Sequence, residues 1–316
     1  MSAGWVAGSV RARALARRRI GARAARQVAA SGSLADALRL LAATPYGREV
    51  HPGQTLAQAQ HGAAAVILWD LRVLAGWLPP GGVPLLQALA AWFEIANVDE
   101  LLMILDGRPL ALDAREPAVQ GELFTLGSLA TAWPRLRNAG SVAGLRAGLA
   151  ASAWGDMGAD SAAAVRFGMR ARWALRVAGF GEPAPAWATA GAALLVAGQR
   201  FVAGQPIPAA ALAPLRGVIG TAVDADTLAG LAAALPSRGR WALAGVTAPG
   251  DLWRAEAAWW ARVQRDGFSL LRTSASSAAP VLGAAAVLAA DAWRARAALE
   301  IAARGGGPLE DYDAVA

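Results

Sequence analysis

The sequence predicts an all-α protein built from three similar helical lobes, and three observations support this prediction. Alanine, leucine and arginine dominate the composition, and all three are strong helix formers. β-branched and aromatic residues do not gather into the short alternating runs that strands require. Two landmarks recur three times in the same order, and 316 residues are enough for two or three domains.

The first landmark is a capped helix that is closed by an aromatic residue. Residues Ser33–Gly47 match Ser141–Gly155 without a gap, with six of fifteen positions identical, and a third copy begins at Thr227. A serine or threonine opens each copy and is expected to cap its helix. An aromatic follows thirteen or fourteen residues later. The capping residues are Ser33, Ser141 and Thr227, and the aromatics are Tyr46, Trp154 and Trp241.

The second landmark is a glycine followed two positions later by proline, a pattern typical of helix ends. It occurs at Gly107–Leu110, Gly204–Ile207 and Gly306–Leu309. Together the two landmarks predict a pseudo-threefold body with lobes at residues 1–110, 111–214 and 215–316.

Apolar residues at three- and four-residue spacing predict the helices between these landmarks. The arginine-rich segment Ser9–Gln27 is predicted to be a folded, amphipathic first helix rather than a transit peptide. The other predicted helices are Ala63–Trp77, Val83–Leu105, Ala162–Ala178, Trp187–Ala203, Asp251–Leu271 and Ala279–Arg304.

No residues in a recognisable catalytic or metal-binding pattern are found. The chain contains no cysteine and no lysine, which excludes thiolate chemistry, the Walker lysine and Schiff bases. The two histidines, His51 and His61, lack an H-E-x-x-H frame, and Asp156 with Asp160 is read as a helix-cap cluster. Glu94, Asp99 and Glu100 are expected on a solvated helix face. We therefore expect a non-enzymatic protein without cofactor or metal.

The net charge of +7 and the pI near 11.2 favour anionic partners such as phospholipid headgroups, acidic protein surfaces or nucleic acid. Two arginine sets are candidates for such an interface, one in the basic first helix and one in a stripe interleaved with Phe167 and Trp173. These residues are Arg11, Arg13, Arg17, Arg166, Arg170, Arg172 and Arg176.

Two uncharged segments, Thr273–Ala290 and Pro183–Gly198, raise the alternative of an integral membrane protein. The first contains Pro280, Gly283 and three serines, which makes it a poor membrane span. A buried, alanine-rich core helix is the favoured interpretation.

Several short segments resemble the C/d subunit family of V-type and A-type ATPases. They are the Val10–Ala14 helix, the segment Leu38–Gly47 ending in Thr44-Pro45-Tyr46, the stretch Phe93–Leu101 with its Glu94-Ile95-Ala96-Asn97 core, and the closing helix Pro280–Ile301. They follow one another in the family's order.

The resemblance implies a funnel-shaped, non-catalytic spacer with three helical lobes, which agrees with the repeat. Such a subunit sits peripherally at the cytoplasmic face of the cell membrane. It joins the rotor shaft to the proteolipid ring, transmits torque during proton or other ion transport, and needs no small-molecule substrate. The alternative that the charge leaves open is a basic helical nucleic-acid-binding or adaptor protein, which would show salt-sensitive DNA or RNA binding.

Overall fold

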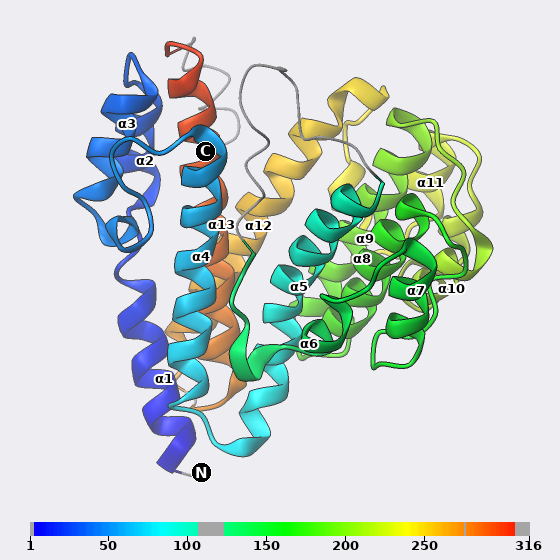
Figure 1. Ribbon diagram of the computed structural model, residues 1–316, viewed down its shortest axis with the longest axis horizontal. Coiled ribbons are helices and arrows are strands. Elements are labelled where there is room, and N and C mark those ends of the chain that lie inside the picture. The colour runs from blue at the N-terminus through cyan, green and yellow to red at the C-terminus, as the bar shows by residue number, and fades with distance from the viewer. Residues whose placement is uncertain (1–2, 107–122, 275, 307–316) are drawn as a thin grey trace. The chain divides into compact units, whose positions relative to one another are not determined.

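The computed structural model describes residues 3–106, 123–274 and 276–306, and all regular elements in these ranges are helical, which confirms the all-α class (Figure 1). The α-helices are α1 (Ala3–Ala16), α2 (Gly21–Ala29), α3 (Leu34–Ala42), α4 (Leu56–Ala75), α5 (Val83–Leu105), α6 (Trp133–Leu136), α7 (Val142–Ala150), α8 (Ala162–Ala178), α9 (Ala184–Ala197), α10 (Ala209–Ile219), α11 (Leu228–Ala234), α12 (Leu252–Arg272) and α13 (Ala278–Ala303). Short 3₁₀ turns and one π-helical turn, η4 (Gly198–Val202), connect them.

The chain divides into two compact units. Unit 1 combines residues Met1–Leu86 with Trp260–Ala316, and unit 2 comprises Gln87–Trp259. Helices α5 and α12 run through the two boundaries. The division into three lobes and their pseudo-threefold, funnel-like arrangement remain predictions.

Unit 1 is organised around α13. Helices α1, α2, α3 and α4 all pack on it, and Figure 1 shows α1, α4 and α13 running alongside one another. The core side of α13 is built largely from alanine, with larger apolar residues such as Val281, Val287 and Leu299 fully buried among them. Small side chains allow close helix approach, which explains how an alanine-rich sequence still makes a dense core.

Unit 2 is organised around α8, which packs against α9 and α10. Helix α8 buries Val165, Phe167 and Met169, and Ser161 caps its first turn by accepting a hydrogen bond from the Ala164 amide. The predicted bounds of α8 and of α5 match the structure. In both helices the apolar spacing continues without a break along the whole element.

The basic amino-terminal segment differs from the prediction of one helix at Ser9–Gln27. It forms two helices, α1 and α2, separated at residues 17–20, and Gly21 adopts a positive φ of 75°. The amides of Ile20 and Gly21 turn away from a helical ladder and donate to the Asp291 carboxylate. The partner that breaks the helix therefore lies some 270 residues away in sequence, where local periodicity carries no information about it.

The starts of α4 and α9 also differ from the prediction, and residues close to them in sequence explain the difference. Helix α4 begins at Leu56, seven residues before the prediction, because Thr55 and Gln58 form a capping box ahead of the apolar run. Helix α9 begins at Ala184, with proline in its first turn, and continues into the π-helical turn η4.

The glycine–proline landmarks are described in part. Gly204 has a positive φ of 61° just after η4 ends, as expected for a helix stop. The landmark Gly107–Leu110 and residues 307–309 of the third lie outside the described residues.

No helix in the described ranges is long and apolar enough to cross a membrane. This includes α9 and α13, which contain most of the two uncharged segments.

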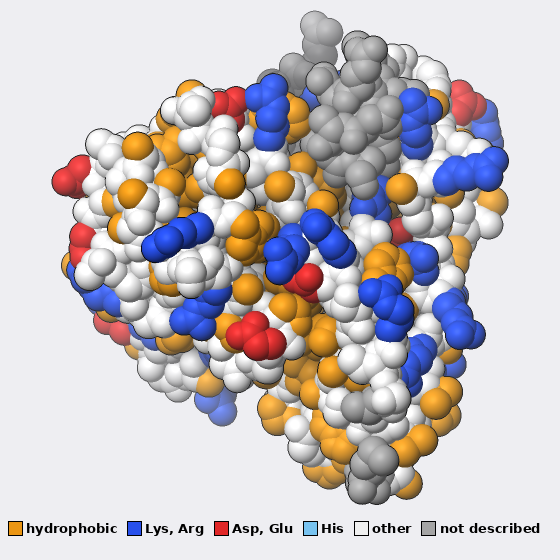
Figure 2. Space-filling view, turned by 180° about the vertical axis from the view of Figure 1, so that it is seen from behind, with side chains coloured by type: hydrophobic (Ala, Val, Ile, Leu, Met, Phe, Trp, Pro, Cys, Tyr) orange, Lys and Arg blue, Asp and Glu red, His pale blue; other side chains and the backbone are white. Residues whose placement is uncertain are grey.

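Charge is divided unequally between the units. Unit 1 contains sixteen arginines against nine acidic residues, whereas unit 2 contains fourteen of each. The whole net charge of +7 thus belongs to unit 1. Figure 2 shows hydrophobic side chains gathered at the lower end of the view, with arginine side chains above them.

Candidate functional site

A buried carboxylate in unit 1 binds the aromatic residue that closes the first landmark, Tyr46, and two backbone amides. Asp291 of α13 is 1% exposed and accepts hydrogen bonds from the amides of Ile20 (3.0 Å) and Gly21 (2.8 Å). The Tyr46 hydroxyl donates a third bond to it, also at 3.0 Å. Burial, followed by the charge of Asp291 and this hydrogen bond, raises the pKa of Tyr46 well above its usual value. We call these four residues carboxylate cluster 1.

Unit 2 contains the same arrangement. Glu94 of α5 is fully buried and accepts hydrogen bonds from the amides of Thr131 (2.6 Å) and Ala132 (2.7 Å). The Trp154 indole N–H donates the third bond to Glu94 Oε1 at 2.9 Å. We call these four residues carboxylate cluster 2. In both clusters a carboxylate on a long helix binds two consecutive amides and the aromatic that closes the landmark.

The turn before each aromatic is also repeated. Thr44 donates its hydroxyl proton to the Leu41 carbonyl (2.6 Å) and accepts from the Tyr46 amide (3.2 Å). Ser152 makes the corresponding bonds to the Leu149 carbonyl (2.7 Å) and the Trp154 amide (3.1 Å). Two segments 108 residues apart therefore share cap, turn and aromatic contact.

The predicted N-caps are confirmed in all three copies. Ser33 accepts from the Asp36 amide, Ser141 from the Gly144 amide, and Thr227 from the Gly230 amide.

The third copy departs from the others after its cap. The Trp241 indole donates to the Arg238 carbonyl at 2.7 Å instead of to a carboxylate. Thr189 of α9 is buried, its hydroxyl donates to the Pro185 carbonyl at 2.8 Å, and it lies against Gly239 so closely that a Cβ there would meet it at 2.4 Å. Close packing replaces the carboxylate cluster. Trp241 borders a surface depression of about 310 Å³ that is lined by small apolar residues together with Asp251 and Arg254.

The interface arginines predicted in the first helix lie in α1 and just after it. Arg13 donates to the Leu271 and Thr273 carbonyls at 3.0 and 2.6 Å, so it ties α1 to the end of α12. The Arg11 guanidinium lies 6.0 Å from the Trp77 ring. Arg17 is exposed to solvent. Of the three, Arg17 is the most accessible to a partner.

The predicted stripe on α8 makes contacts within unit 2. Arg170 donates to Asp99 from both terminal guanidinium nitrogens, at 2.6 and 3.3 Å, and Arg166 approaches the same carboxylate at 3.7 Å. Arg172 donates to the Asp156 carbonyl. Asp99 therefore belongs to an ion pair rather than to a free solvated face. That these arginines also contact a partner remains a prediction.

Arg176 lies beside carboxylate cluster 2. It donates to the Ala153 carbonyl at 2.6 Å, and its guanidinium stacks 4.2 Å from the Trp154 ring. Burial lowers the pKa of Arg176, while the charge of Glu94 opposes that shift. The arginine thus forms the outer cover of the cluster.

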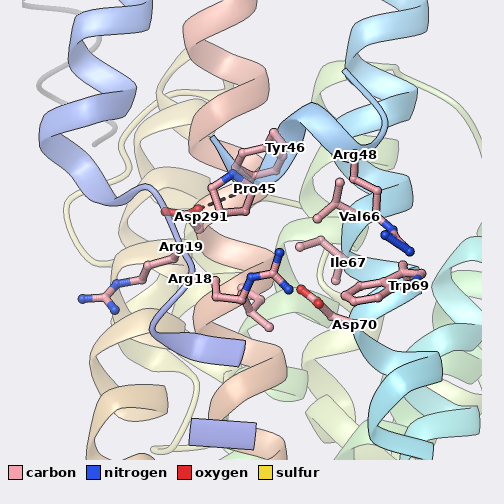
Figure 3. A pocket seen from close by; sticks show the side chains of 11 residues that line it. Arg18, Arg19, Pro45, Tyr46, Arg48, Val66, Ile67, Trp69, Asp70 and Asp291 are labelled. Carbon is pink, nitrogen blue, oxygen red and sulfur yellow. Dashed lines mark hydrogen bonds between the residues drawn. The ribbon is translucent and has the colours of Figure 1, made fainter. Parts of the chain in front are cut away.

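Beside carboxylate cluster 1 lies a small pocket that contains a second buried acid, Asp70 of α4 (Figure 3). Arg18 and Arg48 both stack on the neighbouring Trp69 ring, with Arg48 at 3.8 Å and Arg18 at 5.8 Å. Burial raises the pKa of Asp70 to about 6, although the charges of Arg18, Arg11 and Arg48 oppose the shift. The cavity measures about 20 Å³, which is room for about one water molecule and far too small for a substrate.

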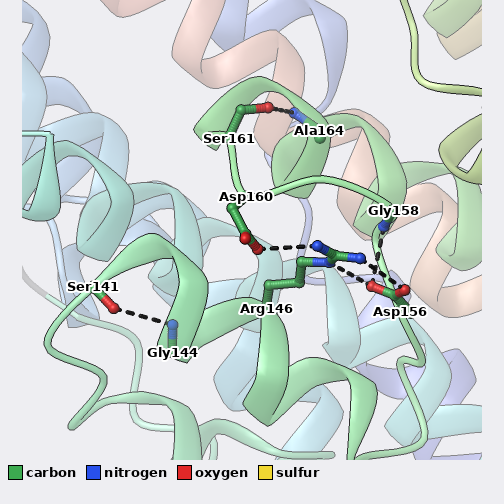
Figure 4. A network of polar contacts seen from close by, with 8 residues as sticks. All are labelled: Ser141, Gly144, Arg146, Asp156, Gly158, Asp160, Ser161 and Ala164. Carbon is green, nitrogen blue, oxygen red and sulfur yellow. Dashed lines mark hydrogen bonds and ion pairs between the residues drawn. The ribbon is translucent and has the colours of Figure 1, made fainter.

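The acidic pair Asp156 and Asp160 binds an arginine (Figure 4). Arg146 donates to Asp156 at 2.6 and 3.0 Å and to Asp160 at 3.1 Å. Hydrogen bonds from Arg146 and from the Gly158 amide lower the pKa of Asp156. The described residues contain no group of three or more acidic or histidine side chains that could hold a metal ion. Helix α8 is capped by Ser161, so the expected helix-cap role of the acidic pair is replaced by an ion pair.

Asn97 also has a structural role. It is fully buried in α5, where its amide donates to the Phe124 carbonyl (2.9 Å) and accepts from the Phe124 amide (2.7 Å). The segment Phe93–Leu101 therefore contributes both Glu94 and Asn97 to the framework of unit 2.

Sequence reasoning missed Asp70, Asp291 and the role of Glu94. The signal for Glu94 and Asp291 was an acidic residue inside an apolar helix, thirteen or fifteen positions before a landmark glycine, Gly107 or Gly306. Asp70 offered a similar signal in the apolar run of α4.

In comparisons with known proteins, no family model matches the chain, and no curated protein matches it significantly.

Proposed function

We propose that this protein is a non-catalytic central-stalk subunit of a V/A-type rotary ATPase. In this role it couples the rotor shaft to the membrane proteolipid ring and transmits torque during ion transport at the cytoplasmic face of the membrane.

The repeated carboxylate cluster is the observation that carries the proposal. It recurs in both units with the same cap, turn, aromatic and paired amides, which supports a body assembled from similar helical lobes. Each cluster joins a long helix to a short capped helix and to a connecting segment through three hydrogen bonds to a buried charge. Such bonds are about twice as strong as neutral ones. A torque-transmitting spacer needs this kind of stiffness.

The residues behind the family resemblance support the same interpretation. Tyr46 ends the first motif and Glu94 lies in the second, and each is part of a carboxylate cluster. Asn97 fastens the second motif to the Phe124 backbone. The motifs therefore build a framework, as expected for a structural subunit.

Affinity purification tests the proposal. The tagged protein is isolated from its native host membranes in mild detergent, with and without nuclease, and the bound proteins are identified. We expect shaft, ring and catalytic-head subunits in both preparations. Recovery of nucleic acid alone, or of no rotary ATPase subunit, would overturn the proposal.

A pair of charge-reversal variants sharpens the result. Arg17→Glu alters the exposed arginine after α1, and Arg238→Glu alters an exposed arginine of unit 2 outside the predicted interface sets. We expect the first to reduce recovery of the ring and the second to leave it unchanged.

A further inference from the structure

The amino-terminal half of α1 and the turn between α4 and α5 form one apolar tip of unit 1. Val6 and Val10 are 45% and 62% exposed, and Trp77 of the turn is 51% exposed. The outward stripe of α1 comprises Ala3, Val6, Val10 and Ala14, which are all exposed and apolar, and Arg17 follows one turn later.

The tip is a single packed body. Gly8 of α1 lies so close to the turn that a Cβ would meet Leu78 Cδ2 at 2.4 Å, and at Gly4 it would meet Pro79 at 3.1 Å. Trp5 packs in turn on Gly82 at the far side of the turn, where a Cβ would meet its ring at 3.0 Å. The start of α1, which carries the exposed valines, therefore packs directly against the turn that carries Trp77.

Polarity changes along the axis of α1 rather than around it. The inner face buries Ala12, Leu15 and Ala16, and the outer face is apolar at its start and basic at its end. Val6 and Arg17 are eleven residues apart, so about 16 Å of helix separates the apolar end from the charge. This distance resembles the passage from the acyl chains of a bilayer to its headgroups.

The segment that follows the apolar start of α1 is basic and therefore matches an anionic surface. Residues 11–19 contain five arginines and no acidic residue. The Arg11 guanidinium lies over Trp77, so a cation and an amphipathic indole are paired at the boundary between apolar and basic regions. Tryptophan and arginine at such a boundary are typical of membrane interfaces.

We propose that this tip docks end-on into an anionic lipid bilayer. Val6, Val10 and Trp77 enter the acyl boundary, while Arg17 and its basic neighbours bind the headgroup phosphates. The inference extends the membrane contact of the proposed function. It concerns lipid alone, so it can fail while the rotary ATPase assignment stands, and the reverse is also true.

Flotation of the purified full-length protein with protein-free vesicles tests the inference. We expect binding to phosphatidylcholine vesicles that contain phosphatidylglycerol, weaker binding to phosphatidylcholine alone, and a loss of binding as salt rises. Absence of binding to the anionic vesicles at low salt would overturn it.

Matched variants locate the docking surface. Val10→Ser together with Val6→Ser should lower the partition coefficient by about tenfold or more, because several buried carbons are lost. Arg17→Gln should lower it by about fivefold, which corresponds to about 1 kcal/mol for one arginine at an anionic surface. Val202→Ser, at an equally exposed valine of unit 2 (61%), should have no effect. Equal losses for Val202→Ser and Val10→Ser would contradict the proposal.

Insertion of Trp77 is measured separately with lipids brominated on their acyl chains. The quenched fraction of fluorescence should fall in Trp77→Phe and should not fall in Trp253→Phe, the matched tryptophan that is 40% exposed in unit 2. The circular dichroism of every variant should equal that of the wild type, since all these positions lie on the surface. An unchanged quenched fraction in Trp77→Phe would overturn the end-on geometry.

Discussion

Units 1 and 2 each contain one carboxylate cluster, and they differ in the charged residue that lies beside it. Asp70 lies fifteen residues after Thr55, the N-cap of α4, and Arg176 lies fifteen residues after Ser161, the N-cap of α8. Asp70 adds a second acid beside carboxylate cluster 1, whereas Arg176 covers carboxylate cluster 2 with a cation. The hydrogen bonds of a repeat can thus be retained while the charge of the neighbouring side chain changes from negative to positive.

The comparison shows which features a repeated framework retains. The cap, the hydroxyl turn and the carboxylate that binds two amides are kept, because each supplies a partner to backbone groups that lie outside the hydrogen-bond ladder of a helix. The neighbouring position differs between the units, with Asp70 in unit 1 and with Arg176, which binds the Ala153 carbonyl, in unit 2. Unit 1 as a whole carries the net charge of the chain.

Removal of the shared carboxylate should have the largest effect. Glu94→Ala and Asp291→Ala each leave two backbone amides and a buried aromatic donor without their acceptor, so each should lower the free energy of unfolding by about 4 kcal/mol. Urea unfolding followed by circular dichroism measures this loss. The isosteric Glu94→Gln and Asp291→Asn should cost less than the alanine variants. A large loss in one unit with none in the other would break the equivalence of the clusters.

The charge difference should appear as a pH dependence confined to unit 1. The pKa of Asp70 is about 6 in the folded protein and near 3.8 when solvated, so between these values the folded state keeps a proton that the unfolded state has lost. The stability contributed by this group is complete below about pH 4 and declines as the pH rises to 6. Asp70→Asn should therefore equal the wild type at pH 4 and exceed its free energy of unfolding by about 2–3 kcal/mol at pH 7.5.

Arg176→Gln is the matched control for this prediction. Arginine stays protonated from pH 4 to 7.5, so the difference between this variant and the wild type should not change across that range. Destabilisation by Asp70→Asn at pH 7.5 would instead show that pairing with Arg18 and Arg48 outweighs burial.

A smaller effect is expected from the aromatic donor of cluster 1. Tyr46→Phe removes only the hydroxyl that binds Asp291 and should cost about 1.5–3 kcal/mol, the contribution of one hydrogen bond to a charged group. Thermal unfolding measures this cost. The comparison sharpens if Asp291→Asn is combined with Tyr46→Phe, because two changes in one cluster should be non-additive.

The smallest effects are expected at the three caps. Ser33→Ala, Ser141→Ala and Thr227→Ala should each cost about 1 kcal/mol. Because all three copies retain this cap, similar losses are expected even though the Trp241 indole of the third copy binds the Arg238 carbonyl instead of a carboxylate. A negligible loss at Thr227 alone would indicate that its helix is held mainly by packing.

Local pattern was sufficient to predict the caps and the bounds of α5, α8, α12 and α13 to within one residue, since these depend on residues close in sequence. Periodicity placed α5 and α8, and a hydroxyl before an apolar run marked Ser33, Ser141 and Thr227. The break between α1 and α2 could not be predicted, because its amides bind Asp291 at the other end of the chain.

The buried carboxylates escaped prediction for a related reason. An acidic residue in a helix is usually exposed to solvent, and the sequence around Glu94 predicts a solvated helix face. Its burial depends on the amides of Thr131 and Ala132 and on Trp154, which reach it only in the folded unit. The alignment of Tyr46 with Trp154 was visible in the sequence. The carboxylate that each of them binds, Asp291 or Glu94, could not be identified from it.

The most direct test of the central claim is ATP-driven ion transport in membrane vesicles from host cells that lack this chain. Proton- and sodium-sensitive dyes report transport while ATP hydrolysis is measured in parallel. The account predicts that transport is lost without the chain and that wild-type protein restores it. Ion transport that remains at the wild-type level without the chain would contradict its role as the coupling between shaft and ring.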